Sequence, residues 1–143
     1  MKIKEIMTTE VEFVQAGDTL QTAARKMRDR DVGFLPVFEG NQLIGVLTDR
    51  DLTIRIMADS TSPNTIISRT MITSPVIYCF EDQDVEDALR LMSINHIRRL
   101  AILSRKDNRL VGVVSLDDLA GTVDGKRIDK LLQSVSSPIK LQQ

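Results

Sequence analysis

The chain has 143 residues, a length that fits one domain or two small ones. Apolar residues make up 42% and charged residues 27%, an ordinary globular mixture that excludes a disordered tail and a fibre. Lys and Arg total 19 against 20 Asp and Glu, so the net charge of -1 gives no global attraction to nucleic acid or to an anionic membrane.

The first residues, Met1 to Met7, carry charged side chains among the apolar ones, and no long hydrophobic run follows them. A signal peptide needs a continuous apolar stretch, and a membrane helix needs a longer one still. We therefore expect neither a secretory leader nor a membrane span.

The segment after this start predicts a strand and then a helix. Val11, Phe13 and their neighbours form a short extended run. Asp18 and Thr19 then offer side-chain oxygens that are typical of a helix N-cap. Apolar residues recur behind them at helical spacing, at Leu20, Ala23, Ala24 and Met27.

A hairpin and a second helix are predicted next. The apolar runs 34–38 and 43–47 flank the turn sequence Glu39-Gly40-Asn41-Gln42, a pattern typical of two antiparallel strands. The helix that follows ends before the polar, Pro-containing stretch 59–64, which we interpret as a connector.

The second half of the chain predicts the same order of elements. The run 76–80 indicates a strand, and Asp84 stands at a helix start. The strands 100–103 and 110–114 flank a longer loop, and a helix follows this hairpin as well. The helix after Asp84 has its apolar residues at Val85, Ala88, Leu89 and Met92.

A C-terminal amphipathic helix is expected after Gly121 and Gly125, which interrupt the preceding helical pattern. An apolar stripe of this kind must be covered, either by its own domain or by a partner chain. The stripe consists of Ile128, Leu131, Leu132 and Val135.

The chain is an internal repeat. Residues 11–38 align with 76–103 at an offset of 65, and residues 43–52 align with 110–119 at an offset of 67. The repeated order of elements predicts the fold class α+β (α/β-type), with two β-α-β-β-α repeats. Each copy is too small to bury a good core alone, so we expect the two repeats to pack as one pseudo-two-fold module. The expected organisation is repeat 1 over 1–60, a connector over 61–67, repeat 2 over 68–121, and a C-terminal helix and tail over 122–143.

Near its end, each copy has a hydroxyl and a carboxylate side chain three residues apart, at the junction of a predicted strand and a predicted helix. The pairs are Thr48 with Asp51 and Ser115 with Asp118. One interpretation is a capping box, in which the two side chains satisfy free backbone N–H groups. The other is a nucleotide site, because a helix start suits a phosphate and a carboxylate one turn later can accept both hydroxyls of a ribose.

Cysteine and histidine occur once each, at Cys79 and His96. A disulfide needs two thiols and a structural zinc site needs about four Cys or His ligands, so we expect no disulfide and no metal site. The sequence around Cys79 is typical of a buried strand, and His96 is expected at a helix end or on the surface. One lone cysteine favours a reducing, cytoplasmic location.

The doubled β-α-β-β-α plan, the ending G-h-[LV]-[ST]-x-x-D-[LI] in each copy (h is apolar) and Leu35-Pro36-Val37 on a strand resemble a tandem pair of cystathionine-β-synthase (CBS) domains, over roughly 3–120. The resemblance implies a module with two clefts between the copies. It also implies binding of adenosine-containing ligands, namely AMP, ADP, ATP or S-adenosylmethionine, pairing into homodimers, and regulation of another protein.

The same resemblance assigns roles to the two hydroxyl–carboxylate pairs. Thr48 and Ser115 correspond to hydroxyls that contact phosphate or ribose in the family. Asp51 and Asp118 correspond to its ribose-binding carboxylates.

Backbone and basic residues complete each implied cleft. The stretches Thr9–Val11 and Ser74–Val76 correspond to segments whose backbone contacts adenine in the family, which places Val11 and Val76 among the candidate binding residues. Arg98 and Arg99 stand where the family often has basic residues that reach phosphates. The first copy has Gly33-Phe34 at these positions, so the two clefts are predicted to be unequal.

We expect no catalysis, because the chain lacks a Gly-rich phosphate loop and a Ser/His/Asp arrangement that the repeats would bring together. The basic stretch 96–109 has no interleaved aromatic residues, so nucleic-acid binding ranks below a phosphate-binding pair and a solvated hairpin. The predicted function is a sensor of an adenosine-containing ligand that acts on an unidentified protein. The alternative is a ligand-independent dimerisation scaffold in which the clefts are vestigial.

Overall fold

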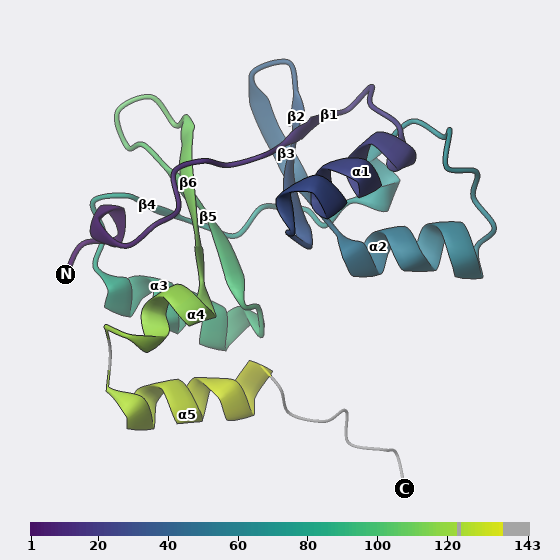
Figure 1. Cartoon of the computed structure of the whole chain (residues 1–143). Helices are drawn as coiled ribbons and strands as arrows, with labels where there is room; N and C mark the ends of the chain where they lie inside the picture. Colours follow the sequence, from purple (N-terminus) through teal and green to yellow (C-terminus); the bar gives the residue numbers. More distant parts are fainter. Residues whose placement is uncertain (123, 136–143) are drawn as a thin grey trace, which may run out of the picture. The chain divides into compact units, whose positions relative to one another are not determined.

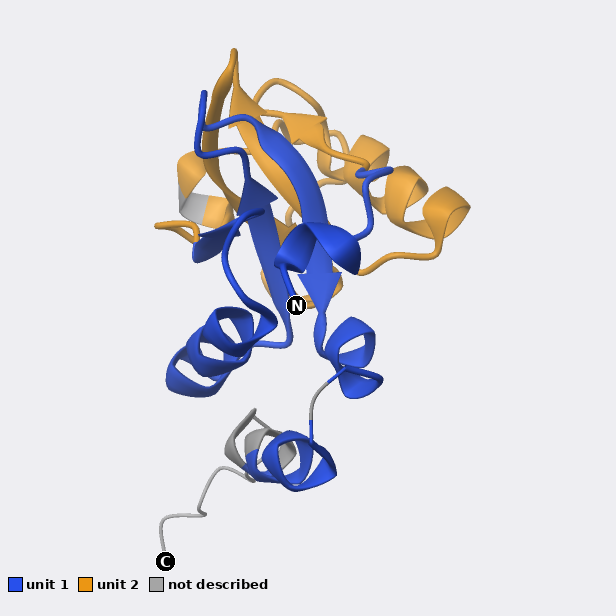
Figure 2. Ribbon diagram, turned by 90° about the vertical axis from the view of Figure 1, so that its left-hand side faces the viewer, with its two compact units in different colours: residues 1–11, 77–143 blue, residues 12–76 orange. Residues whose placement is uncertain are grey.

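The computed structural model describes residues 1–122 and 124–135, and it divides the chain into two compact units (Figures 1 and 2). Unit 2 is the continuous stretch 12–76, drawn in orange in Figure 2. Unit 1 joins residues 1–11 to the chain from residue 77 onward. Among the described residues, no helix has the length and apolar character needed to cross a membrane.

Unit 2 contains the first repeat, folded as one three-stranded sheet with its helices. In chain order its elements are β1 (Val14–Gln15), α1 (Leu20–Arg30), β2 (Phe34–Glu39), β3 (Gln42–Thr48), α2 (Asp49–Thr53), a π-helical turn (Ile54–Ala58) and a 3-10 turn (Arg69–Met71). The sheet order is β1-β2-β3, with β1 parallel to β2 and β2 antiparallel to β3. The π-helical turn continues α2 directly (Figure 1).

Unit 1 contains the second repeat in the same arrangement. Its elements are a 3-10 turn (Ile3–Glu5), β4 (Tyr78–Phe80), α3 (Val85–Asn95), β5 (Arg99–Leu103), β6 (Leu110–Ser115), α4 (Leu116–Ala120) and α5 (Gly125–Val135). The sheet order β4-β5-β6 again has one parallel and one antiparallel pairing. The predicted α+β class and the repeated β-α-β-β-α order are therefore confirmed.

Local signals in the sequence are realised as predicted in both units. The Thr19 hydroxyl accepts a hydrogen bond from the Thr22 N–H at 3.1 Å and caps α1. The β2–β3 hairpin turns through Gly40, whose φ of 62° is the left-handed conformation that favours glycine. Even the irregularity is repeated, because a register shift falls between Val37 and Phe38 in one hairpin and between Ile102 and Leu103 in the other.

The first strand is shorter than the sequence indicates. The extended run was expected from Val11, but β1 contains only Val14 and Gln15. The carbonyl of Phe13 accepts a hydrogen bond from the Lys26 ammonium at 2.7 Å instead of joining the sheet, and the Phe13 ring is 41% exposed. A side chain from α1 thus replaces a strand partner at this position.

Each unit has its own aliphatic core, and each core includes a buried residue that comes before its own repeat or from the other repeat in the sequence. Ile3 lies at the start of the first repeat, yet it is fully buried in unit 1 with the second repeat. Ile67 precedes the second repeat, yet it is buried in unit 2 with the first. The boundaries expected after residues 60, 67 and 121 separate the two sequence repeats, the connector and the C-terminal segment. They stay a prediction.

The C-terminal helix lies in unit 1, where α5 packs against α3 (Figure 1). Its Ile128 is 9% exposed and belongs to the core of this unit, so this part of the expected stripe is covered by its own unit. The side chains of Leu131, Leu132 and Val135 lie outside the described part of the structure.

Candidate functional site

The hydroxyl–carboxylate pair of unit 2 joins the end of β3 to the start of α2. The Thr48 hydroxyl accepts a hydrogen bond from the Asp51 N–H at 3.2 Å, and the Asp51 Oδ2 accepts one from the Thr48 N–H at 2.9 Å. Thr48 has the extended backbone of an N-cap residue, and both side chains are half-buried. The capping-box interpretation is confirmed for this pair.

The pair of unit 1 repeats this geometry at the junction of β6 and α4. The Ser115 hydroxyl accepts from the Asp118 N–H at 3.2 Å, and the Asp118 Oδ2 accepts from the Ser115 N–H at 2.8 Å. The same two reciprocal bonds occupy the same atoms in both units. In each carboxylate the cap uses Oδ2.

A second chain segment runs along each motif strand. In unit 1, Thr8 and Val113 exchange backbone hydrogen bonds of 2.9 and 3.0 Å. In unit 2, Thr73 and Val46 do the same at 2.9 and 3.0 Å. The bonded segment of unit 1 leads into Val11, and the one of unit 2 leads into 74–76.

These segments approach so closely that the motif strands need glycine. A Cβ on Gly112 would lie 2.9 Å from the carbonyl oxygen of Thr8, and one on Gly45 would lie 2.7 Å from that of Thr73. Contacts below 3.0 Å with a hydrogen-bonded backbone cannot be relieved by a side-chain rotation. The glycine of the repeated motif is therefore explained by packing.

The structure assigns the predicted adenine-contacting stretches to particular units. Val11 belongs to unit 1, with Ser115 and Asp118, and Val76 belongs to unit 2, with Thr48 and Asp51. Both valines are half-buried. Each unit thus contains a hydroxyl and a carboxylate from one repeat and an extended segment from the other repeat.

The two predicted phosphate-binding arginines flank the Ser115 cap. Arg99 pairs with Ser115 across the β5–β6 ladder, and the carbonyl of Arg98 accepts a hydrogen bond from the Leu116 N–H at 2.8 Å. Both arginines are exposed, and no ion pair involves either one among the described residues. The structure therefore places these residues close together in unit 1, where β5 begins, β6 ends and α4 begins. They are Arg98, Arg99, Ser115 and Asp118.

The corresponding part of unit 2, at the start of β2 and the end of β3, has no arginine at the two matching positions. Phe34 pairs with Thr48 across the β2–β3 ladder, and the carbonyl of Gly33 accepts from the Asp49 N–H at 3.0 Å. An acidic residue, Asp49, thus begins α2 where an apolar one begins α4. Asp49 was missed as a candidate, although the repeat alignment already sets it against Leu116.

Another residue of the basic stretch, Arg105, makes its contacts within unit 1. Arg105 donates to both carboxylate oxygens of Asp82 at 2.9 and 3.0 Å, and it lies 4.2 Å from the ring centre of Phe80. These hydrogen bonds hold the pKa of the Asp82 carboxyl below its usual range. Arg105 ties the β5–β6 loop to the end of β4.

The single cysteine and histidine have the structural settings that the sequence indicates. Cys79 is fully buried in β4, and burial, with a smaller effect of the Asp87 charge, raises the pKa of its thiol to about 11. His96 ends α3 in the left-handed conformation, with a φ of 54°. Within residues 1–122 and 124–135, no three His, Cys, Asp or Glu side chains lie where they could hold a metal ion.

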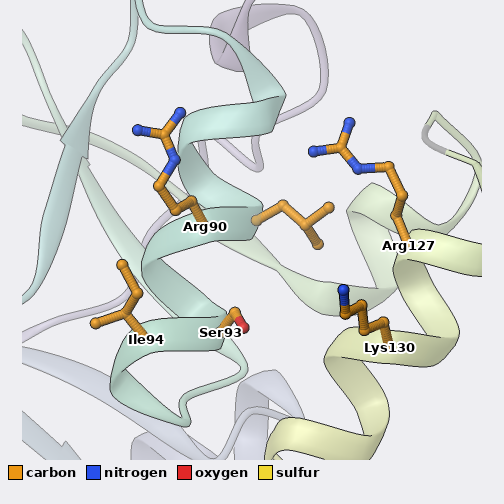
Figure 3. A pocket seen from close by; sticks show the side chains of 6 residues that line it. Arg90, Ser93, Ile94, Arg127 and Lys130 are labelled. Atoms are coloured by element: carbon orange, nitrogen blue, oxygen red, sulfur yellow. The ribbon is translucent and has the colours of Figure 1, made fainter.

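A hollow of about 350 Å³ lies between α3 and α5, away from the predicted site residues (Figure 3). Its cationic side chains are Arg90, Arg127 and Lys130. Arg90 forms an ion pair with Asp87 at 3.3 Å, and Arg127 forms one with Glu86. The pair between Arg127 and Glu86 joins α5 to α3.

The comparisons with known proteins agree with this geometry. A family model for the CBS domain matches residues 3–58 and 67–125. The chain is 41% identical over 118 residues to the CBS domain-containing protein YhcV of Bacillus subtilis, covering 82% of each chain. It is 31% identical over 139 residues to hypoxic response protein 1 of Mycobacterium tuberculosis, covering 96% of each.

Solved structures show the same fold. The crystal structure of hypoxic response protein I with two coordinated zinc ions matches with a TM-score of 0.76 at 31% identity, covering 87% of this chain and 100% of that one. The CBS domain protein TA0289 of Thermoplasma acidophilum matches with a TM-score of 0.84 at 25% identity, covering 96% and 77%. The CBS domain pair of protein MJ0100, in complex with 5′-methylthioadenosine and S-adenosyl-L-methionine, matches with a TM-score of 0.74 at 22% identity, covering 88% and 98%. Since the family model covers both repeats, the chain belongs to the CBS domain family as a tandem CBS pair.

Proposed function

We propose that this chain is a non-catalytic regulatory module that binds an adenosine-containing ligand of the AMP, ADP, ATP or S-adenosylmethionine class. The observation that carries the proposal is the hydroxyl–carboxylate pair, which occurs in both units with the same hydrogen bonds. In each unit the hydroxyl residue of the pair ends a strand, and this strand is also hydrogen-bonded to the segment that leads to 9–11 or 74–76. The proposal places ribose, phosphate and base contacts on these three features.

The carboxylates of Asp51 and Asp118 are the proposed ribose acceptors. The cap bond uses Oδ2, and Oδ1 is the proposed acceptor for the neighbouring 2′- and 3′-hydroxyls of a ribose. The cap also fixes the carboxylate before any ligand arrives, so binding costs little side-chain ordering. Capping and ligand binding are thus compatible functions of one side chain.

Phosphate and base contacts follow from the neighbouring groups. The hydroxyls of Thr48 and Ser115 still have an O–H to donate to a phosphate or ribose oxygen. In unit 1, the exposed guanidinium groups of Arg98 and Arg99 suit a dianionic phosphate. The backbone at Val11 and Val76 is the proposed edge for adenine.

The proposed mechanism is a population shift. A ligand that binds one arrangement of the chain more tightly favours that arrangement, and a partner protein can then distinguish the two states. We propose that the regulator acts in the cytoplasm as a homodimer. The exposed apolar side chains of Ile54 (39%) and Met57 (76%), one helical turn apart, are candidates for a contact between copies.

Calorimetric titration of the full chain with AMP, ADP, ATP, 5′-methylthioadenosine and S-adenosylmethionine tests the proposal. The last two probes are the ligands of the MJ0100 structure, whose likeness to this chain concerns the fold. We expect micromolar to millimolar binding of at least one compound, and its loss in the variant Asp51→Ala/Asp118→Ala. Guanosine and GMP serve as base controls.

The scaffold alternative has one observation in its favour, since each pair forms a complete capping box and so has a structural role without any ligand. It predicts that none of the five compounds raises the melting temperature. It also predicts that the dimer persists on light-scattering chromatography whatever the ligand. That combination of results would overturn the sensor proposal.

A further inference from the structure

The hollow between α3 and α5 is lined by residues that share one face of each helix. On α3 they recur at intervals of three and four residues, and on α5 at an interval of three, which is the spacing of neighbours on a helix surface. Leu89 is 5% exposed and Ser93 is half-buried. The other lining residues are exposed, so the hollow opens at the surface of unit 1; they are Arg90, Ile94, Arg127 and Lys130.

Positive charge predominates in this hollow. Three of its six lining residues are cationic, and none of these six described residues is acidic. Arg90 pairs with Asp87 at 3.3 Å, and Arg127 pairs with Glu86. Lys130 forms no ion pair with a described residue. Three cations against two carboxylates leave one positive charge in excess, which a single monoanion would balance.

The cationic side chains come from both helices. Figure 3 shows Arg127 and Lys130 on the side of α5 that faces α3, with Lys130 across from Ser93 and Arg127 across from Arg90. An anion that enters the hollow therefore meets cations from α3 and from α5, and the Ser93 hydroxyl lines the same space.

The hollow also has an apolar part, formed by Leu89 and Ile94. Ile94 is 65% exposed. One exposed isoleucine is ordinary on a protein surface. Beside three cations, however, it offers an apolar contact to an anion that carries an aliphatic chain, and such mixed lining is typical of small-molecule pockets.

These features belong to unit 1 and lie apart from the repeated motif. In the repeat alignment, Asp29 takes the place of Ile94, so the first repeat has an acidic residue at this position. The helix α5 begins at Gly125, the last residue that the CBS family model matches. Arg127 and Lys130 thus come from a segment beyond the matched repeats, and their chemistry is a property of this chain.

We propose that the hollow between α3 and α5 binds a small aliphatic monocarboxylate, with its carboxylate at Lys130 and its chain against Leu89 and Ile94. The volume of about 350 Å³ lies at the lower end of the range of ligand pockets, which suits a small compound. A carboxylate carries the single negative charge that balances the excess, whereas a phosphate monoester carries nearly two at neutral pH. This site shares no residue with the proposed adenosine site.

Amide NMR spectroscopy of the full chain, titrated with three matched probes, tests the proposal. Hexanoate represents the ligand class, acetate keeps the carboxylate without the chain, and hexylammonium keeps the chain with the opposite charge. We expect hexanoate to shift the amide signals of 89–94 and 126–130 in a saturable way. Acetate should bind at least fivefold more weakly, roughly the effect of losing a partly buried chain, and hexylammonium should leave these signals in place.

Two variants and a control locate the interaction. Lys130→Gln removes the excess charge and should weaken hexanoate binding about fivefold. Ile94→Asp introduces the residue type of the aligned position in the first repeat and should abolish binding. Lys126→Gln is the matched control, because Lys126 is exposed on the same helix and does not line the hollow. All three altered side chains are exposed, so unchanged melting temperatures are expected on circular dichroism.

The proposal is overturned if hexanoate gives no saturable shift at 89–94 and 126–130, or if hexylammonium binds there as tightly as hexanoate. An equal effect of Lys126→Gln and Lys130→Gln would also overturn it, since the attraction would then come from the general charge of α5. None of these results bears on the proposed function, which the adenosine compounds test at other residues.

Discussion

At the scale of single residues, Asp118 combines a structural and a proposed binding role, and two substitutions separate them. Asp118→Ala removes the acceptor of the Ser115 N–H, so we expect the free energy of unfolding to fall by about 1 kcal/mol. Asp118→Asn keeps an oxygen at this position and is expected to cost less than half as much. Both variants should lose at least tenfold in adenosine affinity at unit 1, because neither offers a carboxylate to the ribose.

Chemical denaturation and calorimetry measure the two effects independently. Asp117→Ala is the matched control, since Asp117 is the exposed neighbour and makes no cap bond. If Asp118→Asn bound AMP as tightly as the unaltered chain, the carboxylate would act only as a cap.

The buried thiol of Cys79 predicts an alkaline loss of stability. Burial and the nearby Asp87 raise its pKa from 9.0 to about 11, so the folded chain holds a proton that the unfolded chain releases. The resulting contribution, about 3 kcal/mol, is fully present below pH 9 and is lost as the pH rises through 11.

Urea unfolding at pH 8 and at pH 10.5 checks this expectation. The variant Cys79→Ala leaves a small cavity at both pH values, which lowers its free energy of unfolding throughout. The comparison between the two proteins is therefore the change in the free energy of unfolding from pH 8 to pH 10.5. A slope that is equal in the two proteins would contradict the assignment to Cys79.

At the scale of elements, the glycines of the two motif strands can be tested as a pair. Gly45→Ala and Gly112→Ala place a methyl group against the passing backbone of Thr73 and Thr8, and we expect each to cost about 1 to 3 kcal/mol. Gly121→Ala is the control, because a Cβ there meets nothing within 4 Å. Thermal unfolding followed by circular dichroism gives the comparison.

The helices and hairpins could be predicted from the sequence because their signals are local. Periods of apolar residues, the Thr19 cap and the turn at Gly40 each act within a few residues. The length of β1 could not be predicted in this way, since Lys26 binds the Phe13 carbonyl from another element. Propensity rules contain no information about such a partner.

The candidate site was partly predictable for the same reason. Spacing identifies Thr48 with Asp51 and Ser115 with Asp118, and the structure confirms that each pair is in contact. Asp49 is not part of the repeated motif, which is defined by the hydroxyl and the carboxylate that both copies share, so spacing alone does not single it out.

At the scale of the whole molecule, each unit depends on a segment that lies outside its own repeat in the sequence. Ile3→Ala removes a fully buried side chain from unit 1, and we expect a loss of about 2 to 5 kcal/mol in the stability of that unit. Ile67→Ala should do the same to unit 2.

Hydrogen exchange distinguishes the two variants by location. Ile3→Ala should reduce protection in β4, β5 and β6, although the substitution lies in the first repeat of the sequence. Ile67→Ala should reduce it in β1, β2 and β3. The reverse assignment would show that each segment packs with its own repeat.

The bonds from Thr8 to Val113 and from Thr73 to Val46 give the chain the topology of an inserted domain. Residues 12–76 form one uninterrupted stretch placed between two pieces of the other unit. An expression fragment cut at the end of the first sequence repeat would therefore lose the strand partner of Val46 and keep an N-terminal segment whose partner is missing. The stretch 12–76 is the piece to produce by itself, whereas its counterpart cannot be excised as any single run of residues.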